Sequence, residues 1–308
     1  MTNTILFASL CLVWGATWLA IKIGLTESPP FYGAAIRFLV AALLLGAVVA
    51  WRKPHWPKTR RLWGWIAISA FLMYAGSYAV TYLTEQYMNA ALAAILFASF
   101  PFFVTIGAHY FLTHERLTTV KTAGLVVGFS GVVVLFAGGA NAPSTTAWWA
   151  PGLMLLSPLT SAASNIIVKR HLTGEDPVVL NLIQMSLGVF FLLALAGGFE
   201  DVSDFNWNWT SIGAVLFLAV FGSAFAFVTL YHLLRTMTAS RLSLIAFVTP
   251  VVAAVLDWLV LGDTPTWATA AGACLVLAGL YIVNILGERG LARVVEAPAV
   301  EAVDCRDV

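Results

Sequence analysis

A row of tyrosines lies along one expected helix of this 308-residue chain. Tyr74, Tyr78 and Tyr82 are four residues apart within the apolar run 62–84, and this spacing places them on one helix face. A tyrosine offers a flat apolar ring and one hydroxyl group, which suits a solute with an apolar end and a polar end. The row predicts one wall of a solute-binding cavity, with ordinary helix packing as the alternative.

Other polar and aromatic side chains also lie inside apolar runs. Lipid offers a polar group no hydrogen bond, so these side chains are expected to face the protein interior. They either line a cavity or join helices, since small hydroxyl residues also allow helices to approach closely. The further predicted cavity residues are Trp14, Thr17, Trp18, Ser99, Ser157, Ser161, Asn165, Ser243 and Phe247.

Three charged residues lie within apolar runs or at their ends, namely Lys22, Arg37 and Asp257. Arg37 lies about 9 Å along its expected helix, at about 1.5 Å per residue, which places all three at a similar depth. They predict an outer gate, or a cation that binds a substrate carboxylate. The structural alternative is an ion pair with Asp257, or cations whose charged ends reach back to the membrane surface.

No catalytic constellation is expected. Asp257 is the only clear carboxylate within an apolar run, and it lies at a different depth from His109 and His232. The three cysteines are far apart along the chain, which gives no support to a disulfide framework or a metal site. A Gly-x-x-x-x-Gly-Lys-Ser/Thr loop is missing from the sequence. Neither ATP nor another cofactor is therefore expected, and transport would run on a gradient or an exchanged solute.

Two prolines, Pro101 and Pro250, fall in the middle of apolar runs. Each removes one backbone donor and frees the carbonyl four residues earlier, at Phe97 and Ala246, at a cost of about 3 kcal/mol in a regular helix. Water, a neighbouring helix or a substrate can take up such a carbonyl. The prolines predict hinges at which the helices bend during transport, with static kinks as the alternative.

These residues require a scaffold of membrane-spanning helices. Hydrophobic residues make up 60% of the chain and charged residues only 10%, whereas soluble domains carry about 25% charged residues. The net charge of +1 gives no sign of nucleic-acid binding. Apolar runs of about 20 residues, each long enough to cross a bilayer, are expected at 4–24, 31–51, 62–84, 88–112, 119–138, 148–169, 178–197, 209–234, 239–261 and 266–286.

Basic residues gather on one side of these runs. Of the 16 Lys and Arg residues, all except Lys22 and Arg37 fall in loops of the same side or in the tail, and the loop 52–61 is the most basic. Such an excess is typical of the cytoplasmic side, so both termini are expected to be cytoplasmic. The loop 52–61 has a second interpretation, as a patch that binds anionic lipid.

The chain resembles itself at an offset of 147 to 149 residues. This repetition predicts two five-helix units, 1–143 and 144–287, followed by a disordered cytoplasmic tail, 288–308. Because five is odd, the two units would enter the membrane from opposite sides, as in transporters whose substrate lies between inverted repeats. An old duplication without a transport role is the alternative. The matched pairs include Lys22 and Lys169, Arg37 and Gln184, Tyr82 and Tyr231, Pro101 and Pro250, and Gly131 and Gly279.

The residues that recur in the two halves give the chain, over almost its whole length, a pattern that resembles the EamA-type members of the drug/metabolite transporter superfamily. Its departures are Gln184 where the first half has Arg37, and Thr264-Pro265 where the first half has Arg116-Leu117. The residues of the first half that carry the resemblance are Trp14-Gly15, Lys22, Pro29-Pro30, Arg37, Pro101, Glu115, Gly124, Gly128 and Gly131. Those of the second half are Lys169, Pro177, Pro250, Asp263, Gly272 and Gly279.

Within that superfamily the chain is most similar to the YddG-type bacterial amino-acid exporters. The resemblance implies an all-α membrane protein with a central cavity, which exports amino acids, aromatic ones among them, by alternating access without ATP. Efflux of drugs or metabolites, exchange of nucleotide sugars or phosphate esters, and a channel are the alternatives. Phosphate substrates would call for several buried cations, and only Arg37 lies well inside a run. A monomer or a weak homodimer is expected, with Gly124 and Gly128 as support or as a dimer face.

Overall fold

The structure is a computed structural model that describes residues 2–88, 90–113, 115–136, 147–261 and 267–283. Within these residues the chain is helical and contains no strand. Three segments, η1, η2 and η4, are π-helical, and η3 is a single 3-10 turn. The elements in chain order are α1 (Thr2–Leu25), α2 (Pro30–Arg52), α3 (Arg60–Ala70), η1 (Phe71–Tyr78), α4 (Ala79–Glu85), α5 (Ala90–Phe97), α6 (Phe100–Phe111), α7 (Thr119–Phe136), α8 (Ala150–Met154), α9 (Leu156–Ile167), η2 (Val168–Leu172), α10 (Pro177–Phe199), η3 (Val202–Asp204), α11 (Trp209–Ala219), η4 (Val220–Phe225), α12 (Ala226–Thr236), α13 (Ala239–Ser243), α14 (Ile245–Leu261) and α15 (Trp267–Tyr281).

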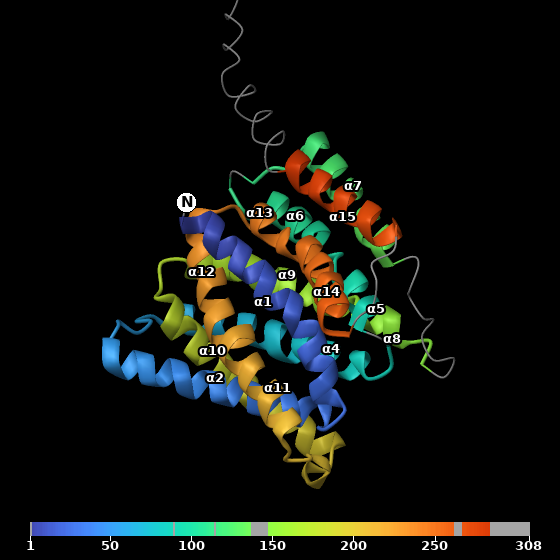
Figure 1. Ribbon diagram of the computed structural model, residues 1–308. Coiled ribbons are helices and arrows are strands. Elements are labelled where there is room, and N and C mark those ends of the chain that lie inside the picture. Colours follow the sequence, from blue (N-terminus) through green and yellow to red (C-terminus); the bar gives the residue numbers. More distant parts are fainter. Residues whose placement is uncertain (1, 89, 114, 137–146, 262–266, 284–308) are drawn as a thin grey trace, which may run out of the picture.

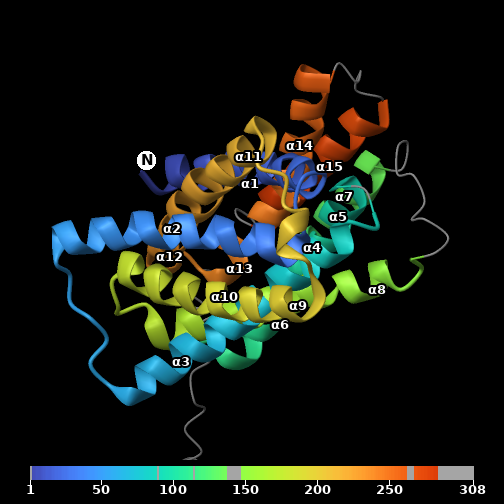
Figure 2. The same ribbon diagram turned by 90° about the horizontal axis from the view of Figure 1, so that it is seen from below.

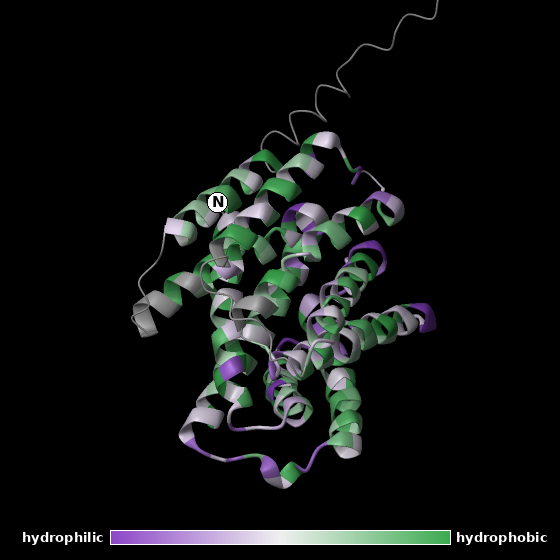
Figure 3. Cartoon of the chain, turned by 90° about the vertical axis from the view of Figure 1, so that its right-hand side faces the viewer, coloured by the Kyte–Doolittle hydropathy of each residue, from purple (hydrophilic) through white to green (hydrophobic). Residues whose placement is uncertain are grey.

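Many of these elements join into long apolar helices. Seven of the helices in the described part of the chain are long and apolar enough to cross a membrane, namely Thr2–Leu25, Pro30–Arg52, Arg60–Glu85, Ala93–Phe111, Ala150–Leu172, Pro177–Phe199 and Trp209–Thr236. Three further apolar helices are shorter, Thr119–Val134, Ala239–Ala253 and Ala270–Tyr281. Each apolar run expected from the sequence thus coincides with an apolar helix. Figure 3 shows hydrophobic residues along the helices and hydrophilic ones at several helix ends and loops.

Five of these helices are interrupted, and one of them, Ala150–Leu172, breaks at Leu155 between α8 and α9 and ends in η2. In the third and eighth, π-helical segments begin at Phe71 and Val220, 149 residues apart. The helix that carries Pro101 breaks between α5 and α6, and Pro101 is the second residue of α6, directly after the break. Pro250, in contrast, stays inside α14, and the chain breaks earlier, at Leu244 between α13 and α14. A helix break thus lies next to Pro101, whereas Pro250 lies inside a continuous helix.

Two pairs of helices pack along each other over much of their length (Figures 1 and 2). The long helices α2 and α10 pack along each other, as do α7 and α15. Glycines bring the second pair into contact, because a Cβ atom on Gly279 would lie only 2.5 Å from the Cα of Gly128. The glycines Gly124 and Gly128 therefore face α15 of the same chain, where they allow backbones to touch.

Two lysines tie the ends of helices together in a related way. Lys22 at the end of α1 donates to the carbonyl oxygens of Glu85 and Met88, at 3.0 and 3.1 Å. Lys169 donates to the carbonyls of Leu234 and of Met237, the latter at 2.8 Å. Each ammonium thus satisfies carbonyls that a helix end leaves without a partner. Lys22, expected at an outer gate, holds the end of α4 to the end of α1.

Candidate functional site

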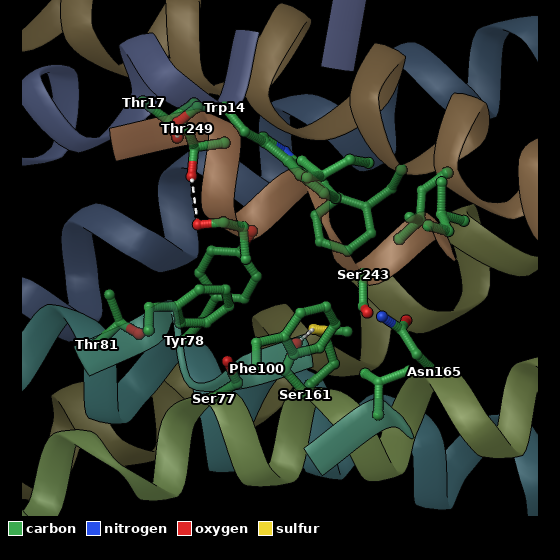
Figure 4. A pocket seen from close by; sticks show the side chains of 18 of the residues that line it. Trp14, Thr17, Ser77, Tyr78, Thr81, Phe100, Ser161, Asn165, Ser243 and Thr249 are labelled. Atoms are coloured by element: carbon green, nitrogen blue, oxygen red, sulfur yellow. Dashed lines mark hydrogen bonds between the residues drawn. The ribbon is translucent and has the colours of Figure 1, made fainter. Parts of the chain in front are cut away.

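A cavity of about 90 Å³ lies among the interrupted helices. Its lining residues come mainly from α1, η1, α6, α9, α12, α13 and α14 (Figure 4). A cavity needs a volume of only about 10–15 Å³ to hold one water molecule, so this cavity has room for several waters or part of a small solute. Seven of the residues predicted for the cavity line it, namely Trp14, Thr17, Trp18, Tyr78, Ser161, Asn165 and Ser243.

Aromatic rings form the centre of the wall. The Tyr78 and Phe227 rings are neighbours, with centroids 6.0 Å apart and planes tilted by 53°, and Trp14 meets Phe227 edge-on at 5.7 Å. Phe38 closes the far side of Tyr78 at 4.8 Å. Trp18 similarly contacts Phe97 edge-on at 5.6 Å, and both residues line the cavity. The cavity thus offers ring faces and edges on which a flat apolar group can pack.

Arg37 is the one cation among the residues that line the cavity, and its side chain is only 1% exposed. Its Nε donates to the Ser223 hydroxyl at 2.8 Å, and its terminal nitrogens donate to the Tyr82 hydroxyl at 3.1 Å and the Gly222 carbonyl at 3.2 Å. The guanidinium also lies 5.1 Å from the centre of the Tyr78 ring, which favours the charged form. These hydrogen bonds use three of its five N–H donors, which leaves donors for a ligand.

Arg37 has no ion-pair partner among the described side chains. The buried carboxyl of Glu85 lies within electrostatic reach of both Arg37 and Lys22, but its oxygens form no hydrogen bond with either. Two cations, Lys22 and Arg37, therefore share the electrostatic influence of one carboxyl group, that of Glu85. The side chain of Asp257, the partner expected from the sequence, lies outside the described residues.

A second buried network surrounds Gln184, the residue that the sequence repeat pairs with Arg37. Its amide nitrogen donates to the Ser69 hydroxyl at 2.6 Å, and its carbonyl oxygen accepts from the Tyr231 hydroxyl at 2.5 Å. Tyr231 is in turn the repeat partner of Tyr82. Each network therefore joins α2 or α10 to the interrupted helices that carry η1 and η4.

Asn165 and Ser243 lie next to each other in the wall of the cavity, on the side away from Tyr78 (Figure 4). The Ser243 hydroxyl donates to the Ser240 carbonyl at 2.8 Å. The side-chain oxygen of Asn165 is buried and has no hydrogen-bond partner. A buried acceptor without a partner is costly, so this oxygen marks a place where a solute can donate a hydrogen bond.

The other five predicted cavity residues lie outside this cavity. Tyr74 is fully buried against α10, where Gly188 makes room, since a Cβ there would lie 2.4 Å from the Tyr74 ring. The Tyr82 hydroxyl accepts a hydrogen bond from Arg37. The hydroxyl of Ser157 bonds to Ser77 and Thr81, at 2.9 and 2.7 Å.

The remaining two of these five also have other contacts. The Ser99 hydroxyl donates to the Leu96 carbonyl at 2.7 Å, within the turn between α5 and α6. Phe247 packs toward α7, where a Cβ on Gly128 would lie 2.7 Å from its ring. Phe227 and Thr249, which were not predicted, do line the cavity. The repeat could have found Phe227, because it lies 149 residues after Tyr78.

Comparisons with known proteins agree with a transporter. The model of the EamA-like transporter family matches the chain twice, over residues 2–137 and 148–285. The uncharacterized transporter YoaV of Bacillus subtilis is 26% identical over 89% of this chain and 94% of its own length. An uncharacterized transporter of Archaeoglobus fulgidus is 28% identical over 90% and 96%. The uncharacterized inner membrane transporter YedA of Escherichia coli is 28% identical over 84% and 82%.

One solved crystal structure has the same fold, with a TM-score of 0.77 over 94% of this chain and 98% of that chain. Its sequence is only 17% identical, so the likeness concerns the fold alone. The two matches of the family model together cover most of the chain, including every helix that lines the cavity. The protein is therefore a multi-pass membrane transporter and not an enzyme, and it belongs to the EamA-like transporter family.

Proposed function

We propose that this transporter exports amino acids, aromatic ones among them, by alternating access. The observation that carries the proposal is the buried Arg37 guanidinium, which borders an aromatic cavity without an ion-pair partner of its own. An α-carboxylate is a natural partner for such a group, because it can accept two parallel hydrogen bonds from one guanidinium.

The rest of the cavity suits the other parts of an amino acid. An aromatic side chain can pack on Tyr78, Phe227 and Trp14. The partnerless oxygen of Asn165 can accept a hydrogen bond from the ammonium group. A nucleotide sugar or phosphate ester is disfavoured, because Arg37 is the single cation in the cavity lining.

The proposed scaffold consists of ten membrane spans in two inverted five-helix repeats, 1–143 and 144–287. Equivalent interactions in the two halves support it. Lys22 and Lys169 both bind the carbonyls at a helix end, and the π-helical segments η1 and η4 begin at matched positions. An odd number of helices per repeat turns the second half over, so that each such pair would lie near opposite membrane surfaces.

Inversion also suggests how the gates would work. The Arg37 network would close the cavity on the outer side, together with Lys22 and Asp257, and the Gln184 network would close it on the cytoplasmic side. Opening one network while the other stays closed exposes the cavity to one side at a time. Bending at Pro101 and Pro250 would accompany this change.

The proposed location is a cell inner membrane with both termini in the cytoplasm, because the basic loops, including 52–61, lie on the side of the termini. The proposed assembly is a monomer or a weak dimer. The glycine face of α7 is already occupied by α15, which favours the monomer.

Counterflow in liposomes tests the proposed substrate. Purified protein is reconstituted with an unlabelled amino acid inside, and the entry of a panel of labelled amino acids is measured. The proposal predicts rapid entry of at least the aromatic amino acids, with empty liposomes and a phosphate ester as controls. If no member of the panel exchanges, the amino-acid assignment is wrong.

A further inference from the structure

A second, larger cavity opens on the surface of the helix bundle, away from the transport cavity. It is a groove of about 450 Å³ between α6 and α9, with α3 and η2 at one end. Its walls are apolar and partly exposed, with Ile106 at 48% and Leu159 at 44% exposure. Gly107 makes the groove deeper, because a Cβ there would press on Ile166 at 3.2 Å. In a membrane such a groove is filled by hydrocarbon.

One end of the groove carries cations and hydrogen-bond donors. Arg170 lines it, and His171 stacks on Trp65 with ring centroids 4.2 Å apart and planes only 4° from parallel. The charges of Arg61 and Arg170 both act on His171. The indole N–H of Trp65 is buried and has no hydrogen-bond partner. Two arginines thus act on the histidine that stacks on this indole, and no acidic residue is among the described residues that line the groove.

We propose that this groove binds an anionic phospholipid, with an acyl chain along α6 and α9 and the phosphate between Arg61, Arg170, His171 and Trp65. The position of the cations supports this occupant. Arg61 is the last residue of the basic loop 52–61, and Arg170 lies in η2 directly after α9, so both belong to the loops in which basic residues gather. Basic pockets between helices at that level of a membrane suit acidic lipid headgroups.

The groove shares α9 with the transport cavity. Ser161 and Asn165 face the cavity, whereas Leu159, Ala163 and Ile166 face the groove. A lipid in the groove would therefore press on the back of the helix that presents Asn165 to the solute. This inference is independent of the substrate, and its test measures lipid binding alone.

The test uses the full chain in detergent, titrated with phosphatidylglycerol or phosphatidylcholine and followed by native mass spectrometry. Each basic residue that lies next to the headgroup of the bound lipid should contribute roughly fivefold to anionic-lipid binding. The double variant Arg61→Gln/Arg170→Gln should therefore bind phosphatidylglycerol about 25-fold more weakly. Lys58→Gln removes one cation from the same basic loop outside the groove, so it should bind like the wild type. Equal binding of phosphatidylglycerol in the double variant and in Lys58→Gln would overturn the proposal, as would equal binding of the two lipids by the wild type.

A second variant tests the acyl chain separately from the charges. Ala163 is exposed and lines the groove, so Ala163→Phe should fill it while every cation stays in place. Phosphatidylglycerol should then bind several-fold more weakly, although the thermal midpoint of unfolding is kept. Unchanged binding would show that the lipid does not lie in the groove.

Discussion

Arg37 has to keep its charge in an apolar setting, and its neighbours show how it does so. The Ser223, Tyr82 and Gly222 oxygens each accept one of its hydrogen bonds, and the Tyr78 ring faces the guanidinium. Gly222 also gives it space, since a Cβ there would lie 3.2 Å from the Arg37 nitrogen. The side chain is thus held in place with donors to spare, as a binding site for an anion requires.

Substitution of Arg37 should change selectivity as well as rate. Hydrogen bonds to charged groups contribute about 1.5–3 kcal/mol, so Arg37→Gln should weaken phenylalanine binding by roughly 10- to 100-fold. Phenethylamine, which has no carboxylate, should compete poorly with phenylalanine in the wild type. That discrimination should disappear in Arg37→Gln, as measured by competition in counterflow. If the variant still prefers phenylalanine, Arg37 does not bind the carboxylate.

Transport of aromatic amino acids should depend more on the ring of Tyr78 than on its hydroxyl group. Tyr78→Ala removes the face that packs on Phe227 and Phe38, so transport of aromatic amino acids should fall by about tenfold or more. Tyr78→Phe keeps the ring and should stay within about threefold of the wild type. Tyr110→Ala, at a residue that is 75% exposed on α6, is the matched control. Equal activity of Tyr78→Ala and Tyr110→Ala would exclude Tyr78 from the substrate path.

At the scale of the element, the packing of neighbouring helices explains why part of the site could not be predicted. Steps of four residues place Tyr74, Tyr78 and Tyr82 on one face of a regular α-helix. The Tyr74 and Tyr78 rings do remain neighbours, with centroids 6.0 Å apart and planes 18° from parallel. Only Tyr78 lines the cavity, however, because Tyr74 is packed against Gly188 of α10 and the Tyr82 hydroxyl accepts from Arg37. The apolar runs and seven cavity residues could be predicted from spacing and polarity. The π-helical turns and the partners across helices depend on tertiary packing.

The break before Pro101 predicts an effect on the rate of transport. Pro101→Ala restores a backbone N–H next to the α5–α6 break and should favour a continuous helix. Exchange should slow several-fold, while equilibrium binding of the substrate changes little. Pro250→Ala, inside α14, should also slow exchange. Wild-type exchange rates in both variants would rule out hinges at these prolines.

The start of α2, the helix that carries Arg37, depends on Glu200. Its carboxylate accepts from the backbone N–H groups of Phe31 and Tyr32, at 2.7 and 2.8 Å. Burial nevertheless raises the pKa of Glu200 above its ordinary value of 4.5. The folded state therefore binds this proton more tightly than the unfolded state. The contribution of Glu200 to stability is greatest below that ordinary value and falls as the pH rises through the raised pKa.

Thermal unfolding in detergent measures this effect. Between about pH 4 and pH 7, the unfolding temperature of the wild type should fall relative to that of Glu200→Gln. Asp204→Asn, at an exposed carboxyl in the same segment between α10 and α11, serves as the control. A difference between wild type and Glu200→Gln that stays constant, or changes in the opposite direction, would contradict the assignment.

At the scale of the whole molecule, the account rests on two buried networks at matched positions. Arg37 with Tyr82 and Gln184 with Tyr231 occupy equivalent places in the two proposed repeats. The repeat could be predicted from the sequence, because lysines, tyrosines and prolines recur at nearly constant offsets. The contacts Arg37–Ser223 and Gln184–Ser69 join the two halves, and no sequence offset indicates such pairs.

The most direct test of alternating access is to measure whether these two networks open in turn. Ser223 and Ser69 are both fully buried, one in each network. Single cysteines there, Ser223→Cys and Ser69→Cys in a chain whose native cysteines are replaced, are labelled with a membrane-impermeant maleimide from either side of proteoliposomes. The account predicts reciprocal labelling, in which a saturating amino acid on one side raises reactivity at one position and lowers it at the other. Simultaneous labelling of both positions would indicate an open channel, and labelling that does not respond to any amino acid would contradict the account.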